Sequence, residues 1–488
     1  MKRLSACIVF SIFFCGFWIN VPVEPVAAAT QPKAPPLIEP DDTSEPVRVD
    51  VSVDWSKSVG DMSPLMWGVC DWDIMSSERA ADPKYNEYLT SLRRPFIRVH
   101  GGIITEWVDP KTKTWDARKI KAGFDAATGY RDAVLMVCVS ARVPGVKETD
   151  WGGYISPADE DRQARFTAEF VRILRDEVKR KVDYWEFFNE WDGWNGKEGS
   201  WDKYGKLDDY WRLINKTAVE IKKVDPGAKI GAAAFIWPNP VWIHGIVEHC
   251  GKNLDFISWH HYAVGDLYDS NEKVLFRVDQ IAFEAKAARK LIEQCSPTKK
   301  FPTFLSEYNM NWDWTQNDPR MRSSFGAVFD ACLLKHVALA GIDGAAIWQV
   351  KNWLYGLIGD RHSPNRSQQY PVQPNTLHPS GYLYQWGHAY LVGRIAETKI
   401  SDETSADCLP IIAQNGKSVL LMNKTRGAVI IPKAKRLLIP AKGEVLRVMV
   451  IDSKGLSSPR VFETNAEDLR LRGYSVTLLT TIPSEGGK

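Results

Sequence analysis

The sequence lacks the features that mark several large functional classes. Its 62 Lys and Arg residues nearly balance its 60 Asp and Glu residues, so the formal net charge over 488 residues is only +2. This balance gives no signal for a polyanionic partner, and we expect no binding of nucleic acid. No Gly-rich phosphate loop follows the first apolar run, which argues against an open, doubly wound nucleotide-binding sheet.

Cysteine is also scarce, and its spacing excludes the common structural metal sites. None of the 8 cysteines forms a CxxC or Cys/His pattern that would suggest a zinc site. We expect no metal and no organic cofactor. Cys138 lies in the apolar run 133–139 and is predicted to be a buried free thiol. A disulfide between Cys250 and Cys295 stays open at this point, because export would permit one.

The N-terminus resembles a secretory signal peptide. Lys2 and Arg3 precede an apolar run from Leu4 to Val21, and the small residues 27–29 form a plausible cleavage site. An uncleaved membrane anchor is the alternative, although the run is short for a span and contains Asn20. We therefore expect a signal peptide over residues 1–29, a secreted or periplasmic protein, and no stable membrane partner after cleavage. Residues 30–46, rich in Pro, Asp and Glu, are predicted to be a linker.

Residues 61–393 alternate apolar, strand-like runs with amphipathic segments that are typical of helices. Eight such units predict an α/β fold, a (β/α)8 TIM barrel, with the doubly wound sheet as the rival. The expected strands are Leu65–Cys70, Phe96–His100, Ala133–Val139, Tyr184–Asn189, Lys229–Phe235, Phe256–Tyr262, Thr303–Glu307 and Gly344–Trp348. The clearest helix patterns cover Asp159–Arg180, Asn271–Glu293 and Arg322–Ala340.

Residues 394–488 have a different pattern, in which short strands are separated by turns. This pattern predicts a small antiparallel β-sandwich, with strands at 408–413, 418–423, 428–431, 444–451 and 474–481. These strands are too few to close a sandwich well. The alternating segment at 47–60 is therefore predicted to cross over and complete it.

Tryptophan is the residue type that the chain has in excess. Many of its 20 indoles are expected in the core, but a surplus this large also fits an enzyme that presents flat apolar faces to the C–H groups of sugar rings. In a barrel of this type, reacting groups lie at the C-terminal ends of the strands. Two of the eight predicted ends carry a glutamate within an apolar or aromatic run, Glu190 and Glu307. Paired carboxylates across a barrel mouth are what glycoside cleavage requires.

Three motifs resemble those of a known group of enzymes. The run Trp185-Glu-Phe-Phe-Asn-Glu190 resembles the strand-four acid/base motif of clan A glycoside hydrolases, and Phe304-Leu-Ser-Glu307-Tyr resembles their strand-seven nucleophile motif. Asp255-Phe-Ile-Ser-Trp-His-His-Tyr262 is similar to strand six of glycoside hydrolase family 39, which contains β-xylosidases and α-iduronidases. The family usually has proline after the Asn-Glu pair, whereas this chain has Trp191.

The resemblance implies a role for each matching residue. Glu190 would be the general acid/base and Glu307 the nucleophile of a retaining reaction, with the two carboxyl groups about 5–5.5 Å apart. Asn189 would bind the 2-hydroxyl of the sugar, and Tyr262 would lie near the nucleophile. The charge of Arg98 would keep Glu307 ionised, and His260 would lie within hydrogen-bond reach of Glu190.

Further strand-end residues are candidates for substrate contacts. His100, Trp191, Trp312 and Trp348 are expected to bind the sugar, and at least one of Trp191, Trp194, Trp312 and Trp314 is expected to line the cleft. Asp71 and Asp73 are either sugar contacts or loop caps. Glu186 is expected to be a buried structural partner of an Arg or Lys.

The sequence thus predicts a secreted, retaining glycoside hydrolase that acts on an oligo- or polysaccharide. Exo action like that of a xylosidase is favoured. The alternatives are an endo-acting polysaccharide hydrolase and, from a different class, a carbohydrate-binding barrel without catalytic activity. The sugar, its linkage and anomer, and the oligomeric state are left open.

Overall fold

The structure is a computed structural model that describes residues 38–100, 104, 106–126, 132–146, 155–192, 207–361, 373–462 and 468–483. The predicted signal peptide, the linker before residue 38 and Trp194 lie outside the described residues. Among the residues that are described, no helix combines the length and apolar character needed to cross a membrane.

Eight parallel strands close into a barrel, in the order β10-β3-β4-β5-β6-β7-β8-β9. Closure is made by β10 and β3, where Trp348 pairs with Cys70, so the predicted TIM barrel is confirmed and the open sheet is excluded. The strands are β3 (Gly68–Asp71), β4 (Phe96–Val99), β5 (Val134–Cys138), β6 (Tyr184–Glu186), β7 (Ile230–Phe235), β8 (Phe256–Val264), β9 (Thr303–Asn311) and β10 (Gly344–Trp348).

Two of these strands begin or end away from the predicted position. The first run opens with the 3-10 helix η1 (Pro64–Trp67), because Ser63 caps it and Pro64 favours a helical first residue, so β3 begins only at Gly68. Strand β6 ends at Glu186 instead of Asn189. The chain beyond it still follows β7, because the amide of Glu190 donates to the carbonyl of Ala234 at 3.0 Å.

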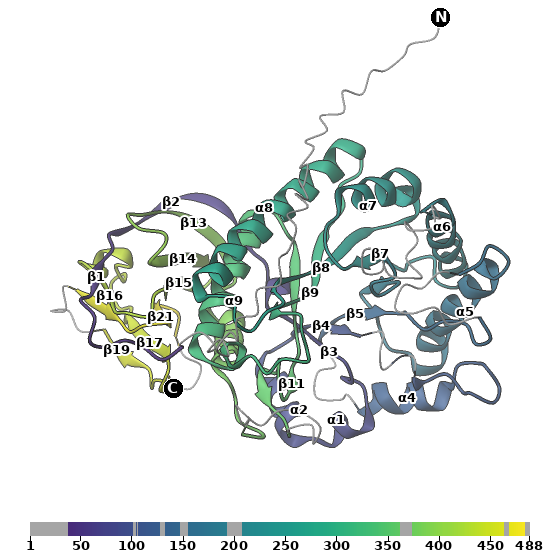
Figure 1. The fold of residues 1–488 in the computed structure, drawn as a ribbon, viewed down its shortest axis with the longest axis horizontal. Coiled ribbons are helices and arrows are strands. Elements are labelled where there is room, and N and C mark those ends of the chain that lie inside the picture. Colours follow the sequence, from purple (N-terminus) through teal and green to yellow (C-terminus); the bar gives the residue numbers. More distant parts are fainter. Residues whose placement is uncertain are drawn as a thin grey trace, which may run out of the picture. The chain divides into compact units, whose positions relative to one another are not determined.

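Helices cover the outside of the barrel (Figure 1). Their apolar faces explain their placement: in α5, Phe166, Phe170 and Ile173 are buried, as expected for a helix with one apolar stripe. The helices are α1 (Ser77–Ala81), α2 (Pro83–Ser91), α4 (Ala117–Ala126), α5 (Glu160–Ile173), α6 (Leu207–Val224), α7 (Pro240–Gly245), α8 (Asn271–Cys295), α9 (Ser324–Leu339) and α10 (Pro379–Tyr390). Short 3-10 and π turns are η3 (Leu174–Val178), η4 (Ile246–Cys250), η5 (Gly251–Asn253), η6 (Pro319–Arg322) and η7 (Ala434–Leu437).

The segments before and after the barrel form a large antiparallel sheet, as predicted, and a small mixed sheet in which β1 is parallel and β20 antiparallel to β16. The larger has the order β18-β17-β21-β15-β14-β13-β2, with β19 also paired to β17, and the smaller has the order β1-β16-β20. A core that includes Val49, Cys408, Val419 and Leu479 lies among these strands. The strands are β1 (Val47–Arg48), β2 (Val51–Met62), β13 (Gly393–Ile400), β14 (Ala406–Ala413), β15 (Gly416–Asn423), β16 (Val429–Ile431), β17 (Arg447–Asp452), β18 (Gly455–Leu456), β19 (Arg460–Val461), β20 (Leu469–Leu471) and β21 (Ser475–Thr480).

The segment predicted to cross over does pair with strands of the C-terminal region, but it forms two strands, β1 and β2, which have different partners. β1 pairs with β16, and β2 pairs antiparallel with β13 and continues to Met62, beyond the predicted end at residue 60. The sequence did not indicate β13, which begins at the predicted boundary between the two parts of the chain. A separate pair, β11 (Lys351–Asn352) with β12 (Ile358–Gly359), lies in the segment that follows β10.

The cysteines that remained outside the predicted signal are all free thiols. Cys250 and Cys295, whose pairing the sequence left open, are not joined by a disulfide. Cys138 is buried, as its apolar run predicted.

Candidate active site

Side chains from five barrel strands meet near the C-terminal ends of those strands. Glu190 follows β6, and Glu307 lies on β9. His260 and Tyr262 lie two residues apart on β8, so they point to the same side of the strand. Strand β4 contributes Arg98, and β10 ends in Trp348.

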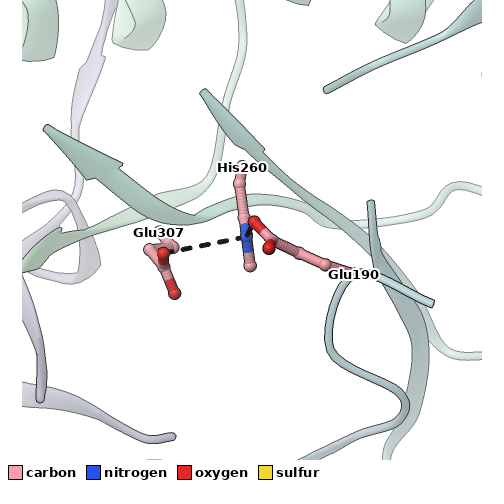
Figure 2. Close-up of side chains that lie close together, drawn as sticks. All are labelled: Glu190, His260 and Glu307. Carbon is pink, nitrogen blue, oxygen red and sulfur yellow. Dashed lines mark hydrogen bonds and ion pairs between the residues drawn. The ribbon is translucent and has the colours of Figure 1, made fainter. Parts of the chain in front are cut away.

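The two glutamates lie on either side of His260 (Figure 2). The Nδ1 atom of His260 is 2.7 Å from Oε1 of Glu190 and 4.0 Å from Oε1 of Glu307. One carboxylate oxygen of each glutamate lies within 4.8 Å of the other. A closest approach this short favours a carboxyl pair that forms a covalent intermediate, whose carboxyl groups lie roughly 5–5.5 Å apart, over an inverting pair, whose groups lie roughly 6.5–9.5 Å apart and leave room for an attacking water.

Glu307 is held by two charged or polar donors. Nη1 of Arg98 donates to Oε2 of Glu307 at 3.0 Å, and the hydroxyl of Tyr262 donates to Oε1 at 2.7 Å. The Glu307 side chain is only 8% exposed, so both oxygens are oriented by protein groups with little competition from water. A carboxylate fixed in this way is suited to act as a nucleophile on a bound substrate.

Arg98 donates hydrogen bonds to Glu186 and Asn189 as well as to Glu307. Its Nε donates to Oε2 of Glu186 at 2.7 Å, which confirms the prediction of a buried structural partner for Glu186. Burial disfavours the charged guanidinium, but the charge of Glu186 and its other neighbours raise the pKa of Arg98 above its ordinary value. Burial likewise opposes ionisation of Glu186, yet Arg98 holds the pKa of Glu186 below its ordinary value.

Arg98 also orients the amide of Asn189. Its Nη2 donates to Oδ1 of Asn189 at 2.7 Å, so the other end of the amide, Nδ2, is left as the donor. The backbone amide of Asn189 in turn donates to the hydroxyl of Ser140 at 3.0 Å. An oriented side-chain donor next to the carboxylate pair is what binding a sugar hydroxyl requires.

The turn that presents Glu190 is held in an uncommon conformation. Glu190 has φ of +52°, in the left-handed region that residues with a Cβ rarely adopt. Asp192 closes the turn by accepting from the amide of Ile236 at 3.1 Å. The Glu190 side chain keeps 23% exposure, so a leaving group and water can reach it.

Trp191 does not lie where a substrate contact was predicted. Its ring is stacked on Phe188 at 3.8 Å between centroids, with an interplanar angle of 8°, and only 3% of the residue is exposed. The Arg142 guanidinium lies over the indole at 5.6 Å. The residue that replaces the usual proline therefore packs beneath the turn and offers no free face to a sugar.

Three aromatic rings form a wall beside Glu307. The His100 ring lies 4.7 Å from Trp348 and 4.9 Å from Trp72, and Nε2 of His100 is 3.7 Å from Oε2 of Glu307. Burial, helped by the charge of Arg98, lowers the pKa of His100 well below its ordinary value. His100 is thus neutral near neutral pH, and its contact with Glu307 is not an ion pair.

The predicted aromatic contacts after β9 lie at the surface. Trp312 is 44% exposed and Trp314 is 56% exposed. The Trp312 indole lies against Gly265, where a Cβ would stand 2.1 Å from the ring, so this glycine is needed for the close approach. The hydroxyl of Tyr355 donates to the Trp312 carbonyl at 3.2 Å.

Asp71 and Asp73 serve as anchors of the loop after β3. Asp71 is fully buried and accepts from the Lys351 amide at 3.1 Å, while Asp73 accepts from Nε of Arg79 at 3.0 Å. Burial and the nearby Asp73 carboxylate raise the pKa of Asp71 to about 8. Trp72, which lies between these two acids, was not singled out from the sequence, because a single indole beside two acids has no distinguishing pattern.

The two glutamates and His260 are also close enough together to be compared with a metal site. Single ligand atoms of Glu190, His260 and Glu307 lie within 4.8 Å of one another. However, both oxygens of Glu307 already accept hydrogen bonds, one of them from the cationic Arg98, whose charge opposes a neighbouring cation. The donor set fits a pair of carboxylates with different roles better than it fits a metal centre.

Comparison with known proteins gives a family for the part of the chain that contains both glutamates. Residues 169–347 match the model of glycosyl hydrolases family 39. A β-xylosidase from Caldicellulosiruptor saccharolyticus is 26% identical over 199 residues, which cover 39% of this chain and 38% of that relative. The matched segment thus spans little more than a third of the relative's length.

Solved structures show the same fold over most of the chain. A monomeric β-xylosidase from Caulobacter crescentus has a TM-score of 0.62 at 15% identity, with 89% of this chain and 99% of that chain covered. A family 51 arabinofuranosidase from Xanthomonas axonopodis pv. citri has a TM-score of 0.61 at 11% identity, with the same coverage. The family match over residues 169–347 and the shared fold make this chain similar to the glycosyl hydrolases of family 39.

Proposed function

We propose that this protein is a retaining O-glycoside hydrolase in which Glu307 is the nucleophile and Glu190 the general acid/base. The observation that carries the proposal is the approach of one oxygen from each carboxylate to within 4.8 Å, with Arg98 and Tyr262 donating hydrogen bonds to Glu307. One carboxylate is thereby held by donors, and the other keeps solvent access for proton transfer. This asymmetry is what the two roles require.

The reaction follows from that asymmetry. Glu307 attacks the anomeric carbon while Glu190 gives its proton to the departing oxygen, which forms a glycosyl ester on Glu307. Glu190 then takes a proton from water, which attacks the same carbon and releases the sugar with retained configuration. His260, 2.7 Å from Glu190, positions the acid/base.

For the substrate, we propose a xylose-containing oligo- or polysaccharide. The support comes from the curated relative and one of the structural neighbours, which are named β-xylosidases. Exo action remains the favoured mode and endo action the alternative. Export through the predicted signal peptide, to a secreted or periplasmic location, also belongs to the proposal. The rival function is a carbohydrate-binding barrel without catalysis.

The test uses aryl glycosides whose leaving groups differ in acidity, together with a polysaccharide panel. We expect Glu190→Gln to lower kcat/KM on the order of 10²–10⁴-fold for a poor leaving group, because general acid catalysis contributes about that much. For dinitrophenyl glycosides the loss in the first step should be small, because this leaving group departs without a proton. Glu307→Gln should lose activity on every substrate.

Two results would reject the proposal. If Glu307→Gln cleaved the panel as well as the wild type, the nucleophile would be misassigned. If the wild type cleaved nothing yet bound oligosaccharides, the binding-barrel alternative would hold.

A further inference from the structure

Trp72 is a large side chain that the reaction outlined above does not use. It directly follows β3, and 45% of its surface is exposed at the end of the barrel that carries the two glutamates. Tryptophan is usually buried to a large extent, and a group of exposed aromatic side chains often marks a binding site.

The Trp72 ring extends the aromatic wall away from the nucleophile. It lies 4.9 Å from the His100 ring and 6.3 Å from Trp348 between centroids, at interplanar angles of 31° and 78°. His100 itself approaches Oε2 of Glu307 to 3.7 Å. Trp72 is therefore one ring further from the reacting centre than His100, about the step from one sugar unit to the next.

The strand order shows on which side of the substrate Trp72 lies. Glu190 follows β6, and β10 stands opposite β6 in the closed barrel, four strands away in either direction. Because Glu190 protonates the leaving group, the leaving group lies on the β6 side. The glycone, which becomes bound to Glu307, then extends toward β10 and its neighbour β3, where Trp72 is.

The loop that carries Trp72 is anchored on both sides of the indole. Asp73 accepts from Nε of Arg79 at 3.0 Å, and Nη2 of the same arginine donates to the Lys351 carbonyl at 2.9 Å. On the other side, Asp71 accepts from the Lys351 amide at 3.1 Å. Because the loop is already fixed, no conformational entropy has to be lost to order Trp72 when a ligand binds, and the affinity is higher for that reason.

We infer that Trp72 forms a second glycone subsite, in which its face packs on the C–H groups of the sugar that precedes the one attacked by Glu307. This inference rests on the proposed function, because the roles of Glu190 and Glu307 decide on which side of the cleaved bond Trp72 lies. It narrows the substrate class to chains with at least two sugar units on the non-reducing side of the cleaved bond, and so favours the endo-acting alternative over the release of single terminal sugars.

The kinetic test compares p-nitrophenyl glycosides of one sugar and of the corresponding disaccharide, beginning with xylose and xylobiose. We expect Trp72→Ala to lower kcat/KM about tenfold for the disaccharide glycoside, mainly through KM, and less than about twofold for the monosaccharide glycoside. Trp72→Phe should recover part of the loss. Phe283→Ala, which removes a 74% exposed aromatic from α8, is the matched control and should change neither value.

Equal losses on both glycosides, or no loss on either, would overturn the second subsite. A binding measurement separates this failure from failure of the proposed function. Isothermal titration calorimetry with xylose, xylobiose and xylotriose compares the Glu307→Gln variant with the double variant that also carries Trp72→Ala. We expect the double variant to bind the two oligosaccharides about tenfold more weakly and to bind xylose equally well. If that dependence appeared although the wild type cleaved nothing, the subsite would stand and the proposed reaction would fall. If binding of all three sugars were independent of Trp72, or undetectable, the subsite would fall.

Discussion

At the scale of single residues, the surroundings of the two glutamates differ in the way that their proposed roles require. Glu307 is held by Arg98 and Tyr262, whereas Glu190 contacts His260 and keeps access to water. The sequence could predict the pair, because each glutamate interrupts an apolar strand at a matching position. It could not predict that Trp191 turns inward, because stacking on Phe188 depends on the left-handed turn at Glu190, which no residue type there announces.

The Tyr262 hydroxyl gives a test at this scale. Tyr262→Phe removes the donor at 2.7 Å from Oε1 of Glu307 and leaves the ring in place. We expect kcat/KM for an aryl glycoside to fall on the order of 10²-fold, the effect typical of losing one donor in a preorganised site. Steady-state kinetics checks this value.

The matched control lies on the neighbouring strand. The hydroxyl of Tyr308 bonds to that of Tyr384 in the core, so Tyr308→Phe removes a buried hydroxyl without touching Glu307. Its activity should stay within about threefold of the wild type, because losing a core hydrogen bond affects stability more than chemistry. Similar losses in both variants would show that the Tyr262 contact is structural only.

At the scale of elements, α9 joins the barrel to the antiparallel sheet. Nearly all of its side chains are buried, because it packs against α8 and α10 on one side and against β2 and β21 on the other. Within this interface, His336 on α9 lies between Asp279 on α8, at 2.9 Å, and Asp407 on β14, at 2.8 Å. Lys335 also contacts Asp407.

The surroundings of His336 predict that the free energy of unfolding depends on pH. Burial opposes its charge, but the two carboxylates raise the pKa of His336 above its ordinary 6.5, despite the opposing charge of Lys335. A folded-state pKa above the unfolded value stabilises the fold fully below about pH 6.5, and the contribution is lost as pH rises through the folded pKa. We expect His336→Gln to lower the free energy of unfolding by roughly 1–3 kcal/mol at pH 5.5, and by less at pH 9.

Denaturant unfolding of the wild type and His336→Gln at both pH values measures the difference. Taking the difference between the two proteins removes contributions from other titrating groups, such as Asp71. An equal deficit at pH 5.5 and pH 9 would mean that His336 acts by packing and not by charge.

The elements themselves differ in how well the sequence indicates them. The eight barrel strands are buried over nearly their whole length and alternate with helices, so their pattern in the sequence is strong. β13 is missed because its residues are half-exposed and charged, and its strand conformation comes from pairing with β2 far away in the sequence. Local periodicity cannot report such a partner.

At the scale of the whole molecule, the barrel and the antiparallel sheets form one compact unit over Pro36–Lys488. The closed order of the strands sets Glu190 and Glu307 at the same end, three strands apart, and brings Trp72 and Trp348 to the opposite side of the barrel from Glu190. We propose that this arrangement produces a covalent glycosyl-enzyme on Glu307.

Trapping that intermediate is the most direct test. The wild type is incubated with the 2-deoxy-2-fluoro dinitrophenyl analogue of a glycoside that it cleaves, and its peptides are analysed by mass spectrometry. We predict a single added fluoroglycosyl group on the peptide that contains Glu307, with none in the Glu307→Gln variant. A label on another residue, or turnover of the natural glycoside with inverted configuration and no label, would contradict the account.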